Sequence, residues 1–487
     1  MTLLPLALLA AAPLQGPTTQ AAPPGADEPR RPNLVFAIAD DWGWPHAGAY
    51  GDKAVATPAF DRVAREGVLF EQAFVSSPSC TPSRGAILTG QHFFRLGAGA
   101  NLWNEWPQDQ FAEYPALLEA AGYHVGSWRK AWGPGKGAPA GKKYKGVQAY
   151  LDARPEGAPL CFWFGAWDPH RGYEAGSGVA DGIALEDVHL FGHFPDDPVV
   201  RSDVADYYFE VQRFDRDVAR LMEQLEAIGE LDNTLLVVTG DHGMPFPRCK
   251  GNVHDSGSRI PLAARWPARF EGGRQVRDLV SLTDIAPTFL EAAGLEVPES
   301  MTGRSLMPLL TYMPSLGTNV TLEIRDRVLI GRERHVPCQE APLMEGYPVR
   351  ALRTMDHLLV HNLFPDRWPA GTPDHENCAT RGSWFGDCDN GPTKLFLWEH
   401  RDEQAVRPYF DLCFAKRPEF ELYDLRTDPM QVNNRADDPV YAETLRALQR
   451  QLASELSDAG DPRSRGKGAL LEGHRYLGGG GGKWPYR

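Results

Sequence analysis

Short apolar runs separated by longer polar or helical stretches dominate the N-terminal two thirds of the chain. Runs at 34–39 (LVFAIA), 160–167 (LCFWFGAW) and 235–239 (LLVVT) are continuous rather than alternating, which is typical of strands buried on both faces of a sheet. Apolar residues recur at helical spacing from Ser202 to Ile228, and Gly229 follows, so a long amphipathic helix is expected here. Strands that alternate with helices favour an α/β fold, with a large, mainly parallel sheet flanked by helices on both faces.

The chain also carries signals for where elements begin and end. Thr57 and Pro58 provide an N-cap and a first-turn proline, and they predict a helix that Gly67 closes. From about residue 320 the segments become shorter and richer in turns, and a final helix is expected at 441–456. The expected division is a signal peptide and spacer (1–30), a main domain (31–320), a smaller C-terminal α+β subdomain (321–465) and a flexible tail (466–487).

The N-terminus has the features of an export signal. The first residues, MTLLPLALLAAAPL, form an apolar stretch of signal-peptide length that is too short to span a bilayer, and the segment 13–29 is expected to be an unstructured spacer. We therefore expect an exported protein (periplasmic, extracellular or lysosomal, depending on the host) with no stable membrane span. The alternative is a frayed apolar N-terminus on a cytosolic protein. Asn319-Val320-Thr321 fits the glycosylation pattern, which matters only in a eukaryotic secretory host.

The charge balance narrows the range of partners. A net charge of −14 is unfavourable for non-specific nucleic-acid binding, so no nucleic-acid partner is expected. If the substrate is an anion, positive charge must be concentrated in a local site. The seven cysteines are an odd number, and Cys378 and Cys388 lie in one Gly/Asp/Asn loop, close enough in sequence to form a disulfide.

Polar residues collect where the predicted strands end. The residues that follow the apolar runs, including a weaker run at 123–126, are Asp40, Asp41, Lys130, His170, Asp241 and His242. The carboxyl ends of parallel strands meet at one edge of an open sheet, and ligands bind there. Three carboxylates at such an edge suit a hard divalent cation, Ca²⁺ or Mg²⁺, better than zinc, which prefers three or four His or Cys ligands. Each aspartate taken singly is also an ordinary turn former.

The segment 79–88, SCTPSRGAIL, combines a cysteine, a proline and an arginine. Pro82 fits a first helical turn, which puts Cys80 at a helix N-terminus, where unpaired N–H groups attract anions. Arg84 adds a guanidinium one turn later, suited to a tetrahedral oxyanion. From these residues alone, Cys80 is either a nucleophile with a low thiol pKa or a buried cysteine before a capped helix.

These motifs carry a family resemblance. CTPSR at 80–84, followed by LTG at 88–90, resembles the signature of the type I sulfatases of the alkaline-phosphatase superfamily, and DD at 40–41 and DHG at 241–243 resemble their two metal motifs. The resemblance extends from Pro32 to about Asp437. It implies an alkaline-phosphatase-like fold and a catalytic sulfatase domain over 31–320. It also implies that a formylglycine-generating enzyme oxidises Cys80 to formylglycine, whose hydrated gem-diol is the nucleophile.

The resemblance also implies roles for individual residues. The expected catalytic residues are Cys80, Arg84, Lys130, His170 and Lys250. The expected ligands of a calcium ion, with magnesium as the alternative, are Asp40, Asp41, the modified Cys80, Asp241 and His242. The cations would stabilise the SO₃ group, and His170 would protonate the leaving group. Many sulfatases have Gly-Lys-Trp-His where this chain reads RKAW at 129–132, so Trp132 replaces a histidine at the substrate site, and position 242 is His rather than Asn.

Three further segments resemble the heparan N-sulfatase (sulfamidase) branch of that family: GMPFP at 243–247, YPVRALR at 347–353 and LVHNL at 359–363. This resemblance implies a sulfated glycosaminoglycan-type saccharide as substrate, with N-sulfoglucosamine favoured. The alternatives are an O-sulfatase or aryl sulfatase on another sulfated glycan, and a formylglycine-dependent phosphonate or phosphodiester hydrolase. A non-catalytic glycan-binding relative is the alternative of another class, and a homo-oligomer stays open.

A basic segment in the C-terminal part is out of character for an acidic protein. We expect Arg334, His335 and Arg350 to line the mouth of the pocket and to bind carboxylates or hydroxyls of the saccharide. The alternative is a set of Arg–carboxylate pairs on the surface, which contribute little to stability.

Overall fold

The computed structural model describes residues 30–478, with gaps at 107–109, 313–324 and 381. The expected signal peptide and the Asn319-Val320-Thr321 pattern lie outside the described residues. Residues Pro32–Arg487 form one compact unit by their contacts, separate from Met1–Arg31, so the expected domain boundary near residue 320 stays a prediction. None of the described helices is long and apolar enough to cross a membrane.

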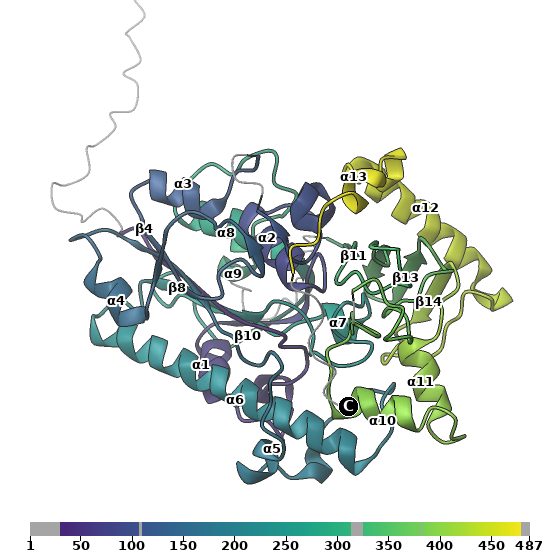
Figure 1. Cartoon of the computed structure of the whole chain (residues 1–487). Helices are drawn as coiled ribbons and strands as arrows, with labels where there is room; N and C mark the ends of the chain where they lie inside the picture. Colours follow the sequence, from purple (N-terminus) through teal and green to yellow (C-terminus); the bar gives the residue numbers. More distant parts are fainter. Residues whose placement is uncertain (1–29, 107–109, 313–324, 381, 479–487) are drawn as a thin grey trace, which may run out of the picture. The chain divides into compact units, whose positions relative to one another are not determined.

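An eight-stranded, mostly parallel sheet forms the centre of this unit, which confirms the expected fold class (Figure 1). Only β9 runs antiparallel to its neighbours, β2 and β8. The three apolar runs form β1, β7 and β8, which lie side by side in parallel. In spatial order the strands are β10 (Arg274–Ser281), β2 (Val68–Phe74), β9 (Leu262–Arg265), β8 (Thr234–Gly240), β1 (Asn33–Ala39), β7 (Leu160–Gly165), β4 (His124–Arg129) and β6 (Lys142–Tyr144).

Helices cover both faces of this sheet, which explains why its central strands β1, β7 and β8 carry apolar residues on both faces. Alternate residues of β1 belong to different cores: Val35 and Ala37 pack on one face, and Phe36 and Ile38 on the other. The first face is covered by α1 (Pro58–Glu66), α4 (Val147–Asp152) and α6 (Pro198–Ala227), with α5 (Ser177–Ala180) packed on α6. The second face is covered by α2 (Cys80–Thr89), α3 (Tyr114–Ala120), α8 (Ile285–Ala292) and α9 (Met307–Thr311) (Figure 1).

The two helices expected from end signals are both present. Helix α1 starts at Pro58 and ends before Gly67, as the sequence predicts. Helix α6 starts four residues earlier than expected, because Asp197 caps it by accepting a hydrogen bond from the Val199 amide and Pro198 fills its first turn.

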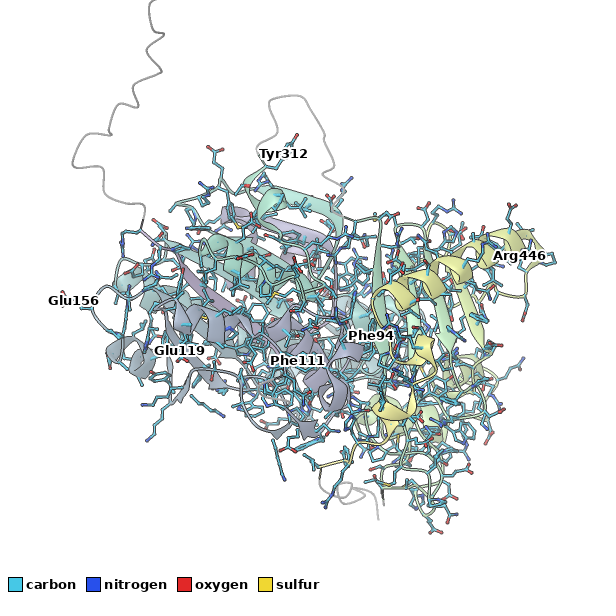
Figure 2. All side chains as sticks on the ribbon, turned by 90° about the horizontal axis from the view of Figure 1, so that it is seen from above. Phe94, Phe111, Glu119, Glu156, Tyr312 and Arg446 are labelled. Carbon is cyan, nitrogen blue, oxygen red and sulfur yellow. The ribbon has the colours of Figure 1, made fainter. Side chains whose placement is uncertain are left out.

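A separate four-stranded antiparallel sheet forms the C-terminal part, in the order β11 (Arg327–Arg332), β12 (Val349–Thr354), β13 (His357–Asn362) and β14 (Phe420–Asp424). Helix α12 (Ala442–Asp458) packs Leu448 and Leu452 on one face of this sheet, in a cluster that also contains Phe94. Figure 2 labels Phe94 near this junction and shows Arg446 projecting from α12. The remaining helices are α7 (Asp255–Ser258), α10 (Pro392–Glu399), α11 (Arg407–Phe414) and α13 (Ala469–Glu472).

Two expectations need correction. The tail is not free from Gly466 onward, because α13 buries Leu471 and the Leu471 carbonyl accepts a hydrogen bond of 2.9 Å from Asn101. Residues 479–487 lie outside the description. Cys378 and Cys388 do not pair: both are buried free thiols, as are the other five cysteines.

Arg350 is a structural residue rather than a substrate ligand. Its side chain on β12 is 1% exposed, and it donates hydrogen bonds to Asp461 at 2.8 Å and to Glu333 at 2.6 Å. These carboxylates neutralise a guanidinium that is shielded from solvent, so the expected substrate role of Arg350 is not supported. The ion pair between Arg350 and Asp461 instead ties β12 to the segment that follows α12.

We predict that Arg350→Ala lowers the free energy of unfolding by about 3–5 kcal/mol, because it leaves Asp461 buried without its charge partner. Urea denaturation followed by circular dichroism measures this change. Arg407→Ala is the matched control, since Arg407 forms an exposed pair with Asp411, and its loss should leave the unfolding midpoint nearly unchanged. Equal, small effects of both substitutions would contradict the structural role of Arg350.

Candidate active site

The carboxyl ends of β1 and β8 bring the expected acidic residues together. The two strands are parallel neighbours in register, with Ala39 opposite Gly240, so Asp40 and Asp41 emerge beside Asp241. The Asp41 amide donates a hydrogen bond of 2.9 Å to Oδ1 of Asp241. Asp41 has a φ of 73°, a left-handed conformation that is unusual for a residue with a side chain. Strain of this kind often accompanies functional sites.

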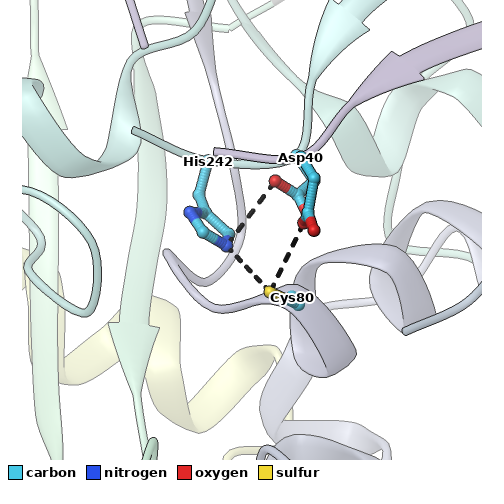
Figure 3. Close-up of side chains that lie close together, drawn as sticks. Asp40, Cys80 and His242 are labelled. Carbon is cyan, nitrogen blue, oxygen red and sulfur yellow. Dashed lines mark hydrogen bonds and ion pairs between the residues drawn. The ribbon is translucent and has the colours of Figure 1, made fainter. Parts of the chain in front are cut away.

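Cys80 is the first residue of α2, as the sequence predicts, and it faces these carboxylates. Its Sγ donates a hydrogen bond of 3.6 Å to Oδ1 of Asp40 and lies 3.3 Å from Nε2 of His242 (Figure 3). One potential ligand atom from each of Asp40, Cys80, Asp241 and His242 lies within 4.8 Å of all the others, and all four residues are buried.

Each of the three carboxylates is paired with a different buried cation. Nζ of Lys130 lies 2.5 and 2.6 Å from the two carboxylate oxygens of Asp40. Nζ of Lys250 donates to Asp41 at 2.8 Å, and Nε of Arg84 donates to Asp241 at 2.8 Å. An unpaired charge buried at this depth would be very costly. Each of these charges can therefore be buried only because its partner neutralises it.

Electrostatics fix the protonation states of two of these groups. Burial by itself would raise the pKa of Asp40, but the charges of Lys130, His170, Arg84 and Lys250 outweigh it and hold this pKa well below its usual range. Burial raises the pKa of the Cys80 thiol well above its ordinary value, despite the nearby lysines. Unmodified Cys80 is therefore a neutral thiol at neutral pH, which argues against its use as a low-pKa thiolate nucleophile.

The residues present fit a hard cation. The cluster of Asp40, Cys80, Asp241 and His242 offers carboxylate oxygens from different loops and one imidazole. Oδ1 of the neighbouring Asp41 lies 3.3 Å from Nε2 of His242 and is buried without a hydrogen-bond partner. A buried carboxylate oxygen that lacks a donor is satisfied by a bound cation. With one histidine and one cysteine, the cluster is poor in the ligands that zinc prefers.

A pocket of about 880 Å³ opens beside Cys80 and contains most of the expected site residues. The residues from the sequence prediction that line it are Asp40, Cys80, Lys130, Trp132, His170, Lys250 and His335. Trp132 is buried, donates to the Gly137 carbonyl at 3.0 Å and packs on Trp106. His335 is also buried, and its Nδ1 lies 2.8 Å from Oγ of Ser79, the N-cap residue of α2. His170 is exposed, with Nδ1 3.0 Å from the Arg171 carbonyl.

The structure does not bring Arg334 to this pocket. Its guanidinium lies 5.8 Å from the ring of Tyr476 and lines a second pocket, of about 650 Å³, formed with the C-terminal segment. Its backbone bonds to Asn101 and Leu102 hold it there. Together with the burial of Arg350, this leaves His335 as the only one of the three expected saccharide ligands of the basic segment that lines the described active-site pocket.

Asp389 and Arg171 are among the pocket residues that sequence reasoning missed. Asp389 accepts a hydrogen bond of 2.9 Å from Lys250, so this lysine bridges Asp389 and Asp41. Arg171 donates two hydrogen bonds to Asp203, at 2.7 and 2.8 Å, and lines the wall of the pocket. Asp389 lies in an irregular loop rich in Gly, Asp and Asn, where an aspartate has no signal that separates it from a turn former.

A mostly parallel sheet whose carboxyl edge holds a cysteine at a helix N-terminus, three carboxylates and three cations is the arrangement that the resemblance to the alkaline-phosphatase-like sulfatases implies. The comparisons with known proteins agree. The sequence matches the Sulfatase family over residues 32–161 and the C-terminal family of N-sulphoglucosamine sulphohydrolase over 240–316. A further match, over 186–257, is to the type I phosphodiesterase / nucleotide pyrophosphatase family.

Individual relatives are similar over most of their length. The chain is 29% identical to the human N-sulphoglucosamine sulphohydrolase, covering 88% of this chain and 91% of that protein. It is 26% identical to an ulvan-active sulfatase of Formosa agariphila, and the match covers 88% of this chain and 81% of that protein. A solved structure in complex with its substrate D-glucosamine-2-N,6-O-disulfate shares the fold with a TM-score of 0.62 and 20% identity, covering 88% of this chain and 98% of that one. The phosphonate monoester hydrolase of Agrobacterium radiobacter also shares the fold, with a TM-score of 0.62 and 18% identity. The match covers 89% of this chain and 97% of that one.

The sulfatase family model thus matches part of this chain, and the relatives that are similar to most of it are sulfatases, enzymes that hydrolyse sulfate esters and sulfamates. Sulfatases of this family generally use a formylglycine and a divalent cation.

The bridge made by Lys250 leads to a pH-dependent prediction. Burial by itself would raise the pKa of Asp389, but the charges of Lys250 and His170 hold it below its usual range. A carboxyl group with a lowered folded-state pKa adds stability above its unfolded pKa, and this stability is lost as the pH falls. Lys250→Met should therefore destabilise the metal-free protein most at neutral pH, and the difference from wild type should shrink below about pH 4.

Urea unfolding in the presence of a chelator, at several values from about pH 7 to about pH 3, measures this difference. Lys467→Met is the control, since Lys467 is an exposed lysine outside the pocket. A destabilisation by Lys250→Met that does not depend on pH would contradict the electrostatic role of the bridge.

Proposed function

We propose that this enzyme removes sulfate from a sulfated glycosaminoglycan-type saccharide, with N-sulfoglucosamine as the favoured unit, after Cys80 has been converted to formylglycine. The observation that carries the proposal is the position of Cys80, buried at the start of α2 within hydrogen-bond distance of Asp40 and 3.3 Å from His242. The choice of substrate is supported by the similarity to the human N-sulphoglucosamine sulphohydrolase, which extends over 88% of the chain and includes a match to its C-terminal family.

Two groups would complete this site. Hydrated formylglycine supplies a hydroxyl nucleophile, and a bound calcium ion, or magnesium as the alternative, supplies a positive charge for the sulfate oxygens. The residues that would hold the cation are Asp40, Asp41, Asp241, His242 and the modified side chain at position 80. A formylglycine-generating enzyme is therefore a required partner during maturation.

The remaining charged residues of the pocket would bind and orient the SO₃ group. Lys130, Lys250 and Arg84 lie next to the carboxylates of the cluster, so a cation that takes over those carboxylates frees lysine and guanidinium donors for sulfate oxygens. His170 lines the same pocket and is exposed, so it would hold the proton that the leaving oxygen or nitrogen receives.

A second candidate function has its own support. The match to the type I phosphodiesterase family over 186–257 and the shared fold with a phosphonate monoester hydrolase favour activity on a phosphonate or phosphodiester. Both substrate classes present a tetrahedral anion to the same cations, so the pocket accommodates either one. A panel of substrates separates them.

The export of the chain belongs to the same proposal. The apolar N-terminal stretch supports passage into a periplasmic, extracellular or lysosomal compartment, where polymeric sulfated saccharides are accessible.

We predict that protein matured with a formylglycine-generating enzyme releases sulfate from N-sulfated glucosamine faster than from 2-O-, 3-O- or 6-O-sulfated saccharides, and faster than it cleaves a phosphonate monoester. Cys80→Ser is the matched control: it should abolish release while the melting temperature stays within about 2 °C of wild type, because serine fits the start of α2. Full activity of Cys80→Ser would refute the proposed nucleophile. Faster cleavage of the phosphonate would favour the second candidate.

We predict that a chelator lowers both activity and melting temperature, and that calcium restores both, because the cation offsets the repulsion between clustered carboxylates. Asp40→Asn should reduce the calcium-dependent rise in melting temperature, whereas Asp196→Asn, at an exposed position, should not. Metal analysis that finds stoichiometric zinc without calcium or magnesium would show that the assignment of the cation is wrong.

A further inference from the structure

Two exposed tryptophans are among the residues that line the active-site pocket. Trp103 is 38% exposed and Trp167 is 52% exposed, whereas Cys80 in the same pocket is 3% exposed. A single exposed apolar residue is ordinary on a protein surface. Two exposed indoles in the lining of one pocket, in addition to its buried charged groups, are more than the chemistry at Cys80 requires.

The fold holds Trp103 in place with contacts from distant segments. The residue has a φ of 53°, in the left-handed region that a bulky residue rarely adopts. Its carbonyl accepts a hydrogen bond of 2.9 Å from the Leu477 amide, and the preceding amide, of Leu102, donates to the Arg334 carbonyl at 3.0 Å. Strain maintained by several contacts at a pocket is typical of a site that binds a ligand.

The strand pair next to Trp103 further restricts its position. Trp103 directly precedes β3 (Asn104–Glu105), which pairs with β5 (Gly135–Lys136) in the loop that carries Trp132. Any side chain at Gly135 would place its Cβ 2.0 Å from the Asn104 carbonyl oxygen, so this close packing requires glycine. The indole is thus presented by a firmly packed wall.

The backbone around Trp167 is also held by hydrogen bonds, here to the end of strand β1. Trp167 follows β7, and its neighbours on both sides bond to the β1 segment: the Ala166 amide donates to the Ile38 carbonyl at 2.9 Å, and the Asp40 amide donates to the Asp168 carbonyl at 3.1 Å. The backbone that carries this indole is therefore tied to the segment that positions Asp40.

We propose that Trp103 and Trp167 form a stacking subsite for the sugar ring next to the sulfated unit, a proposal that rests on the proposed function. The apolar faces of a pyranose ring pack on indole rings, and a rigid aromatic surface binds them at little entropic cost. The pocket volume of about 880 Å³ lies toward the upper end of the range for ligand pockets, roughly 300–1,000 Å³, and leaves room beyond a single sulfated sugar. The enzyme would then prefer saccharide chains to monosaccharides.

The test compares an N-sulfated heparan-type tetrasaccharide with N-sulfoglucosamine as substrates of the matured protein. Wild type should have the higher kcat/KM on the tetrasaccharide. Trp103→Ala and Trp167→Ala should each lower the ratio of tetrasaccharide to monosaccharide kcat/KM by about tenfold, and Trp103→Phe should restore part of it. Met355→Ala is the control, since Met355 is 48% exposed and does not line the pocket.

A binding measurement keeps the subsite separate from catalysis. Isothermal titration of the tetrasaccharide into the Cys80→Ala protein should give a Kd that rises about tenfold when either tryptophan is also replaced by alanine. Ratios and Kd values within about twofold of the parent protein would overturn the subsite and leave the proposed function intact. If the matured wild type releases no sulfate from either saccharide, the proposed function fails, and the titration still decides the subsite, because absence of tetrasaccharide binding overturns it as well.

Discussion

The mutual neutralisation of three buried carboxylates and three buried cations is the constraint on which the active-site region depends. The pairs are Asp40 with Lys130, Asp41 with Lys250, and Asp241 with Arg84, and all six side chains are almost completely buried. Removing any one of them leaves a charge in a region of low polarity, where desolvation costs several kcal/mol per ion. A substitution that removes one charge is therefore expected to be tolerated better when its partner charge is removed as well.

The six partners come from segments far apart in the sequence, so this neutral arrangement exists only when the elements are correctly assembled. The strand ends of β1 and β8 supply the acids, α2 supplies Arg84, and the segments after β4 and β8 supply the two lysines. Because β1 is apolar on both faces and covered by helices on each, its end is held firmly enough to fix charges within hydrogen-bond distance. Packing of the sheet and chemistry at its edge are therefore parts of one cooperative structure.

Those parts of the site that follow from local pattern were predictable, and those that follow from long-range contact were not. Asp40 and Asp241 come directly after apolar strands, and Cys80 comes before a helix-starting proline, so the sequence alone places them at one edge. Arg334 and Arg350 were expected at the pocket on the basis of charge alone, yet the partners that position them, Tyr476 and Asp461, lie more than 100 residues away in the sequence. The sequence alone gives no sign that Asp389 is more than a turn residue, and only its contact with Lys250 in the structure places it at the site.

The burial of Cys80 imposes an order of events on biosynthesis. A side chain that is 3% exposed in the folded protein is out of reach of another enzyme, so any enzyme that modifies it must act before the surrounding chain closes. Lys250, His335 and Asp389, which line the pocket with it, are made later, the last of them roughly 300 residues after Cys80. At about 5–20 residues per second, translation leaves roughly 15–60 seconds in which Cys80 has emerged and its pocket is still incomplete. Under the proposed maturation of Cys80, the speed of synthesis therefore limits the time available for the modification.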